Sequence, residues 1–180
     1  MKIYTIGHSA HTLDQLIRLL EANSIKVLVD VRTTPNSHFH PQFNKENLEF
    51  FLPKNEIQYV FAGKSLGGRP DEPSCYKSHV LPSEGADYLH EVDYPEVMKK
   101  PWFLEGIDLL LKLAEEQTTA IMCSEEDPSL CHRHHLIAKY LMQTYPEVVV
   151  WHIRGDGTAY NAAMVLTSVQ TESVKQLSLF

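Results

Sequence analysis

The strongest constraint on the fold is a set of short apolar runs that alternate with segments of helical periodicity. Residues 27–31 (VLVDV) form a continuous apolar run broken by one aspartate, which is typical of a central parallel strand covered on both faces. Similar runs predict four more strands, at residues 2–6, 57–61, 119–123 and 148–153.

Apolar residues between these runs recur at helical spacing. We expect a helix that follows Thr12 as its N-cap, a short helix at 45–52, and a longer helix at 102–116. A further helix should begin at Asp127 and Pro128 and end near Tyr145. Alternating strands and helices predict a three-layer α/β fold, with a mostly parallel sheet of about five strands and helices on both faces.

Length and cysteine usage set the expected organisation and location. The 180 residues, 43% of them hydrophobic, suffice for one core, so we expect a single α/β domain at 1–166 and a C-terminal tail at 167–180. Three cysteines, an odd number, fit free thiols in a reducing compartment. The start of the chain lacks a signal-peptide core and no run is long enough to cross a membrane, so we expect a cytoplasmic protein with no membrane partner.

The charge balance bears on nucleic-acid binding. The formal net charge is −7, with 16 basic and 23 acidic residues. This argues against a protein that coats nucleic acid through its overall field, because such domains are usually basic. A local basic cleft for DNA or a nucleotide is compatible with the balance.

Polar residues follow each predicted strand, at the sheet edge where open α/β folds bind ligands. We expect a site there with three catalytic candidates, which are His8 as acid or base, Cys123 as nucleophile, and Asp30. The candidates for holding the substrate are Ser9, Arg32, Gly67, Gly68, Ser124, Glu125, Cys131, His132 and Arg133. The alternative is that these positions are polar only because loops are polar.

The densest of these segments is 123–133, which runs from a strand end into a predicted helix. Helix N-terminal amides and Arg133 could bind an anion such as phosphate, and a thiol at that position would shift toward thiolate. The segment lacks the cysteine-phosphatase spacing, because Ser129 stands where that pattern has arginine. Either cysteine could instead be a buried apolar side chain.

Two other features leave alternatives open. Asp30 and Arg32 should point to the same side of a strand, either as an internal ion pair or as an acid or base held by arginine. Cys131, His134 and His135 share a predicted helix, and Cys123 could complete a metal set. No zinc-finger spacing occurs, so we assign no metal ligands and leave the cofactor open.

Five short motifs together resemble the family called domain of unknown function 488. They are residues 5–9 (TIGHS), 30–32 (DVR), 66–68 (LGG), 123–125 (CSE) and 131–133 (CHR). The family has three-layer α/β relatives and no established activity, although some members carry a DNA-repair label. The resemblance implies that these positions belong together.

The last five residues resemble the pentapeptide with which bacterial replication and repair proteins bind the polymerase sliding clamp. Leu177, Leu179 and Phe180 would enter an apolar pocket, while Gln176 and Ser178 complete the pattern. The alternative is that these apolar residues pack on the domain, because Val169, Val174, Leu177 and Phe180 have partly helical spacing.

These observations lead to two functional hypotheses. The first is an accessory factor of DNA replication or repair, recruited by the clamp, that acts as a hydrolase or transferase on a phosphate-bearing substrate. The second is a non-enzymatic adaptor, or a sensor of a metal or another ligand.

Overall fold

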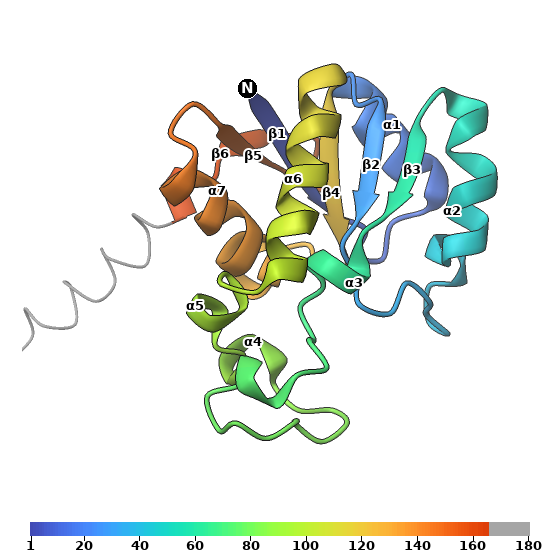
Figure 1. Cartoon of the computed structure of the whole chain (residues 1–180). Coiled ribbons are helices and arrows are strands. Elements are labelled where there is room, and N and C mark those ends of the chain that lie inside the picture. Colours follow the sequence, from blue (N-terminus) through green and yellow to red (C-terminus); the bar gives the residue numbers. More distant parts are fainter. Residues whose placement is uncertain (166–180) are drawn as a thin grey trace, which may run out of the picture.

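A six-stranded sheet lies between two helical layers in the computed structural model, which describes residues 1–165 (Figure 1). The strand order is β3-β2-β4-β1-β5-β6, and all neighbouring pairs are parallel except β5 and β6. The strands are β1 (Lys2–Gly7), β2 (Val27–Asp30), β3 (Gln58–Phe61), β4 (Thr119–Cys123), β5 (Val149–Ile153) and β6 (Ala159–Asn161). The predicted fold class is therefore confirmed, with one strand more than expected.

Side chains of the central strands alternate between two hydrophobic clusters, one on each face of the sheet. In β2, Val27 and Val29 face one cluster and Leu28 the other. In β4, Ile121 faces the same cluster as Val27 and Val29, and Met122 faces the same cluster as Leu28. Burial on both faces explains why these strands are continuous apolar runs in the sequence.

The helices cover the two faces in pairs. α1 (Leu13–Ala22) and α2 (Lys45–Phe51) supply one cluster, and Thr12 caps α1 by accepting a hydrogen bond from the Gln15 amide. α6 (Pro101–Glu116) and α7 (Lys139–Thr144) supply the other. Short 3₁₀ turns occur at Pro41–Phe43, Pro53–Asn55, Pro73–Cys75 and Pro128–Leu130.

The helix predicted to begin at Asp127 and Pro128 and to end near Tyr145 is wrong in its extent, because it is not continuous. Asp127 does cap a turn, since its carboxylate accepts from the Ser129 amide, but that turn ends after Leu130. Cys131 has extended backbone, with φ −138° and ψ 140°, and this interrupts the helix. Helical structure resumes as a π-helical segment, Arg133–Ala138, that continues into α7. The break places Cys131 and His132 in a turn.

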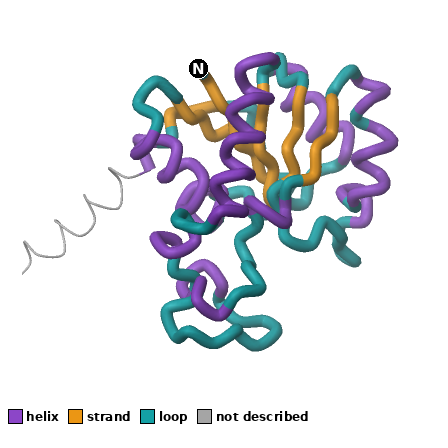
Figure 2. Tube along the Cα trace, viewed as in Figure 1, coloured by secondary structure: helices purple, strands orange, loops and turns teal. Residues whose placement is uncertain are grey.

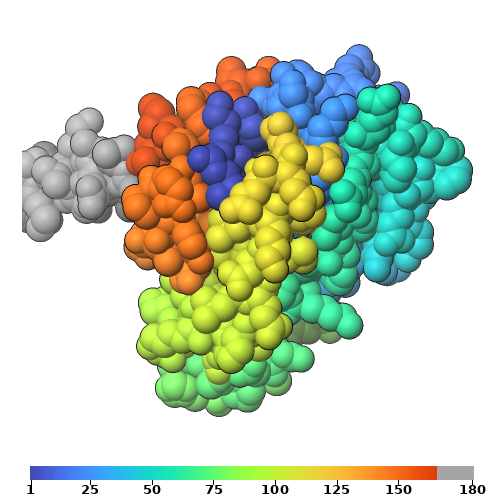
Figure 3. All heavy atoms as spheres, turned by 45° about the horizontal axis from the view of Figure 1, so that its top comes forward, coloured from blue at the N-terminus to red at the C-terminus, as the bar shows by residue number. Residues whose placement is uncertain are grey.

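Residues 62–100 cover the carboxyl ends of the strands. They contain three short helices, α3 (Gly63–Leu66), α4 (Tyr88–Glu91) and α5 (Tyr94–Val97), and a long loop joins α3 to α4 (Figure 2). The segment forms the lower part of the molecule in Figure 1, below the arrowheads of β2 and β4. The space-filling view shows the same green region projecting from one end of the molecule (Figure 3). None of the helices described in residues 1–165 is long and apolar enough to span a bilayer.

Candidate functional site

A cleft of about 740 Å³ lies between the carboxyl ends of the strands and the covering segment. Cys123, Cys131 and His132 line it on the sheet side, while Arg69, Tyr88 and Tyr94 line it from the cover. The cleft therefore occupies the position where open α/β sheets bind ligands.

Two thiols and one imidazole converge in this cleft. The Nδ1 atom of His132 lies 3.6 Å from Cys123 Sγ and 3.9 Å from Cys131 Sγ. The two sulfurs and Nδ1 all lie within 4.8 Å of one another, and Cys123 and Cys131 are only 5% and 1% exposed. We call these three residues the thiol–imidazole centre.

The orientation of the His132 ring is fixed from two sides. Its Nε2–H donates to the Val31 carbonyl at 3.1 Å, which leaves Nδ1 as the nitrogen that faces the sulfurs. On the other side, the backbone of Gly68 lies against the ring. A Cβ at Gly68 would come within 2.6 Å of His132 Cγ, so only glycine allows this approach.

The protons of the centre are distributed unequally. Its hydrogen bond to Cys131, together with burial, raises the pKa of the Cys123 thiol. Burial alone would raise the pKa of Cys131 as well, but hydrogen bonds from Cys123 and His132 outweigh it and lower this pKa well below the usual range. Hydrogen bonding to Cys131 likewise overcomes burial and raises the pKa of His132. Of the two thiols, Cys131 therefore loses its proton more readily than Cys123.

Two further groups adjoin the centre. Cys123 Sγ donates to Glu125 Oε2 at 3.2 Å, and burial raises the pKa of the Glu125 carboxyl. The hydroxyl of Tyr94 is buried in the wall of the cleft and has no hydrogen-bond partner among residues 1–165. Burial, and then the nearby charges of Cys131 and Cys123, raise the pKa of Tyr94, so it stays a neutral donor.

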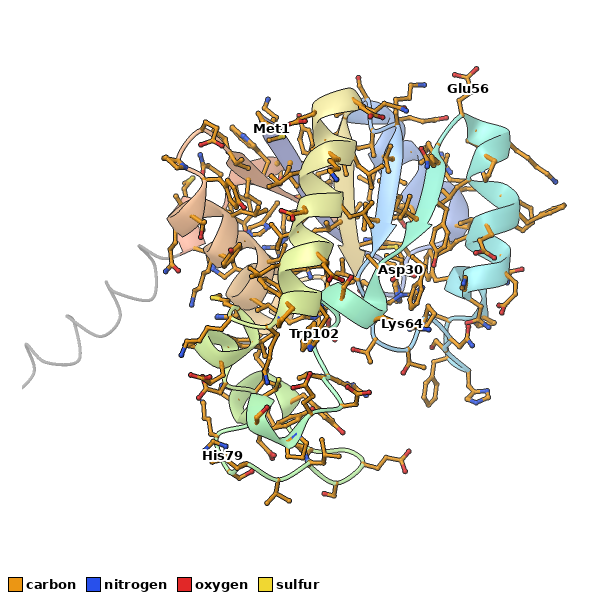
Figure 4. All side chains as sticks on the ribbon, viewed as in Figure 1. Met1, Asp30, Glu56, Lys64, His79 and Trp102 are labelled. Atoms are coloured by element: carbon orange, nitrogen blue, oxygen red, sulfur yellow. The ribbon has the colours of Figure 1, made fainter. Side chains whose placement is uncertain are left out.

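Asp30 lies at the carboxyl end of β2 (Figure 4) and forms an internal ion pair with Arg32. Arg32 donates through Nε and Nη2 to the two carboxylate oxygens, at 2.9 and 2.6 Å, and Tyr59 donates its hydroxyl to Oδ2 at 2.8 Å. Arg32 Nη2 also donates to the Phe43 carbonyl at 2.7 Å. Asp30 is fully buried and outside the cleft lining, so its geometry fits a structural ion pair and not the expected acid or base.

His8 lies beside Arg32, and its surroundings keep its imidazole neutral. Arg32 Nη1 donates to His8 Nε2 at 3.2 Å, so the His8 proton lies on Nδ1, which donates to the Ser9 carbonyl at 3.0 Å. Burial lowers the pKa of His8 to about 4. Its ring stacks on Phe43 at 4.4 Å between centroids and does not line the cleft. This arrangement gives no support to His8 as the acid or base of a reaction in the cleft.

Arg133 fastens the loop after β4. It is fully buried, and its guanidinium donates to the backbone carbonyls of Glu125 and Glu126 and to the Thr5 hydroxyl. Arg154 holds the same loop through the Glu126 carboxylate, with Nε and Oε1 2.8 Å apart. Arg133 thus faces the protein's own carbonyls, which argues against its expected contact with an anion.

Arg69 is a cleft residue that the sequence predictions did not include. Its guanidinium carbon lies 4.6 Å from the centroid of the Tyr88 ring. The side chain is exposed and forms no ion pair or side-chain hydrogen bond with another residue of the described part of the chain. Arg69 directly follows Gly67 and Gly68 in the sequence. This position, after two glycines that were predicted to hold the substrate, is the sequence signal that could have identified it.

The predicted site residues therefore separate into two groups. Those that line the cleft are Arg32, Gly68, Cys123, Ser124, Glu125, Cys131 and His132. Those that lie outside the lining are His8, Ser9, Asp30, Gly67 and Arg133. Members of the second group support the first, as when the Ser9 amide donates to the Ser124 carbonyl at 2.8 Å. Gly67 packs against Thr33, which lines the cleft.

The alternative metal set of the sequence analysis is not brought together. His134 Nδ1 lies 3.0 Å from His152 Nε2, in a buried pair, and His135 Nε2 donates to the Ser129 carbonyl. Neither ring faces the two cysteines, because Cys131 precedes the helix instead of lying within it. The five residues of the clamp-like peptide lie outside the described residues.

Fold and site together define a mostly parallel α/β protein with a buried cysteine–histidine centre in a cleft at the carboxyl edge of its sheet. The model of the family described as "Domain of unknown function DUF488" matches residues 12–141, and the chain belongs to this family. The matched region includes the thiol–imidazole centre and begins after residues 5–9, which the resemblance had included. No curated protein and no solved structure matches the chain.

Proposed function

We propose that the cleft binds a phosphate-bearing ligand and that the thiol–imidazole centre is its reactive part. The observation that carries this proposal is the convergence of Cys123, Cys131 and His132 in the cleft. Burial keeps bulk water from the centre, while the cleft gives a ligand access to it. In this proposal the protein is a hydrolase or a transferase.

Arg69 is the residue proposed to bind the phosphate. It is the arginine of the cleft whose side chain forms no hydrogen bond to the rest of the described chain, and stacking on Tyr88 holds it in the wall. A guanidinium binds phosphate through two parallel hydrogen bonds. Ser124 and Asn36, which line the same cleft, offer neutral donors beside it.

The replacement Arg69→Gln tests this role. We expect it to weaken binding of inorganic phosphate or a nucleoside monophosphate about 10- to 100-fold, because a charged hydrogen bond contributes about 1.5–3 kcal/mol. Calorimetric titration measures the change, and Arg18→Gln, an exposed arginine on α1, is the control. Equal affinity in the two variants, or no phosphate binding by the unmodified protein, contradicts the proposal.

The protein is further proposed to work at bacterial DNA replication or repair, where its residues 176–180 would attach it to the sliding clamp. Support comes from the agreement of all five residues with the clamp-binding pattern and from the net charge of −7, which disfavours strong DNA affinity of its own. Recruitment by a partner would bring such an acidic protein to DNA.

Recruitment is tested by titrating the clamp with three forms of the protein. The full chain should bind, while a chain that lacks residues 176–180, or that carries them in permuted order, should lose at least about tenfold in affinity, since hot-spot anchors each contribute about 2 kcal/mol or more. The permuted chain controls for composition. Equal binding by all three forms removes the clamp from the proposal.

A second candidate function is a non-enzymatic adaptor or ligand sensor. The observation that favours it is that the side chains of Arg32 and Arg133, which were expected to bind an anion, instead hydrogen-bond to groups of the protein itself. Ligand binding without turnover would support this candidate over the enzyme.

A further inference from the structure

We infer that the thiol–imidazole centre is a binding site for a thiophilic divalent metal ion of the zinc class, with Cys123 Sγ, Cys131 Sγ and His132 Nδ1 as its ligands. The inference deepens the proposed function by assigning a metal to the reactive centre. It rests on the proposed function only for what the metal would do to a ligand, because metal binding itself can be measured with no phosphate-bearing ligand present.

The distances within the centre fit a tetrahedral metal site. With zinc–sulfur and zinc–nitrogen bonds of about 2.3 and 2.0–2.1 Å, tetrahedral geometry places sulfur and nitrogen about 3.5–3.6 Å apart. His132 Nδ1 lies 3.6 Å from Cys123 Sγ and 3.9 Å from Cys131 Sγ. The two sulfur–nitrogen distances are therefore close to those of a tetrahedral site, and the two sulfurs lie within 4.8 Å of each other, so a metal ion needs only small side-chain movements.

The histidine is oriented as metal-bound histidines are. Its Nε2–H donates to the Val31 carbonyl, which orients the ring and directs Nδ1 at the two sulfurs. The Gly68 backbone lies against the part of the ring that contains Cγ and Nδ1. A histidine that only filled space would not need both a fixed ring orientation and a glycine contact.

A tetrahedral metal ion with these three ligands would have a fourth coordination position, and side chains with oxygen atoms lie in the same cleft. Glu125 Oε2 lies 3.2 Å from Cys123 Sγ, near enough to occupy this position or to accept a proton from water bound there. The Tyr94 hydroxyl is buried in the wall of the same cleft, has no partner in residues 1–165, and is therefore free to donate to a ligand in the cleft. Two thiolates, one imidazole and one open position are typical of catalytic zinc sites.

Charge and proton balance are satisfied when the metal binds. The Cys123 S–H bond and the N–H bond of His132 Nδ1, which is hydrogen-bonded to the Cys131 thiolate, both break. The two protons pass to solvent, two sulfur–metal bonds form, and the freed Nδ1 lone pair binds the metal. No group changes oxidation state. Soft thiolates with an imidazole select zinc over magnesium or calcium, which prefer oxygen ligands.

The test is metal binding by the reduced, chelator-treated full chain. We expect it to bind one Zn²⁺ per chain in competition with a chromophoric chelator. Cys131→Ser and His132→Gln should each lose more than about 100-fold in affinity, since outer-shell partners alone contribute about 10- to 100-fold. Cys75→Ala is the matched control, because Cys75 is a buried free thiol outside the cleft, and it should bind zinc as the unmodified chain does.

A spectroscopic measurement needs no variant and so avoids the risk of misfolding. Co²⁺ added to the unmodified protein should give the intense d–d bands of a tetrahedral ion and a thiolate-to-metal charge-transfer band. A six-coordinate spectrum without that band, or full zinc affinity in a folded Cys131→Ser variant, overturns the inference. If the unmodified protein binds zinc but no phosphate, the proposed function is contradicted and the metal site is not. If it binds phosphate but no zinc, the metal site is contradicted and the proposed function is not.

Discussion

Asp30→Asn should destabilise the protein by about 3–5 kcal/mol, the cost of leaving one member of a buried ion pair without its partner. The asparagine has nearly the same shape, so the effect isolates the charge. Arg32, which is 4% exposed, would remain in the protein without its carboxylate. Because Arg32 also donates to His8 and to the Phe43 carbonyl, several loops at the strand ends should loosen together.

Urea unfolding followed by circular dichroism measures this loss of free energy. The control is Asp108→Asn on α6, an exposed carboxylate, where we expect a change within about 0.5 kcal/mol, as for most surface substitutions. A loss below about 1 kcal/mol at Asp30 would mean that the pair contributes no more than an exposed one does. In that case Asp30 would have to be reconsidered as a group kept for function.

Gly68→Ala should damage the site more than the fold. The added Cβ would lie 2.6 Å from His132 Cγ and 2.7 Å from Nδ1, so the ring must move and Nδ1 must shift relative to the sulfurs. We expect zinc affinity to fall about 10- to 100-fold, as when a supporting partner of a metal ligand is lost. Stability should fall by only about 1–3 kcal/mol, the usual cost of overpacking.

The matched control is Gly157→Ala in the turn between β5 and β6. Gly157 has φ +88°, so alanine there is strained by about 1–2 kcal/mol. Its added Cβ would lie 3.9 Å from Leu19 Cδ2, which is an ordinary contact distance. Zinc affinity should be unchanged in this variant. If both variants bind zinc equally well, the Gly68 backbone does not hold His132 in place.

The central strands and the position of the cleft could be predicted from the sequence, for a simple physical reason. β2 and β4 are buried on both faces, so their burial appears directly as apolar runs, and β4 begins and ends at the predicted residues. β6 could not be predicted in this way, because it has three half-buried residues and pairs with one neighbour at the sheet edge. The strand-end rule then placed Cys123 and Gly68 at the cleft.

The roles of the arginines and histidines depend on tertiary partners that no local pattern encodes. Arg133 ends the motif CHR, and its guanidinium donates to backbone carbonyls. Arg69 follows the motif LGG, and it lines the cleft. Helical spacing that runs through Cys131 predicts His134 and His135 as its partners in the alternative metal set. The extended backbone at Cys131 ends that spacing, so the neighbouring His132 faces the sulfurs instead.

An anomalous difference map from crystals of the zinc-loaded protein tests most directly whether two thiols and one imidazole form a single centre. We expect one peak in the cleft, about 2.3 Å from both Cys123 Sγ and Cys131 Sγ and about 2.0–2.1 Å from His132 Nδ1. A Cys123–Cys131 disulfide with the metal bound elsewhere, or a His132 ring turned away from both sulfurs, would contradict it.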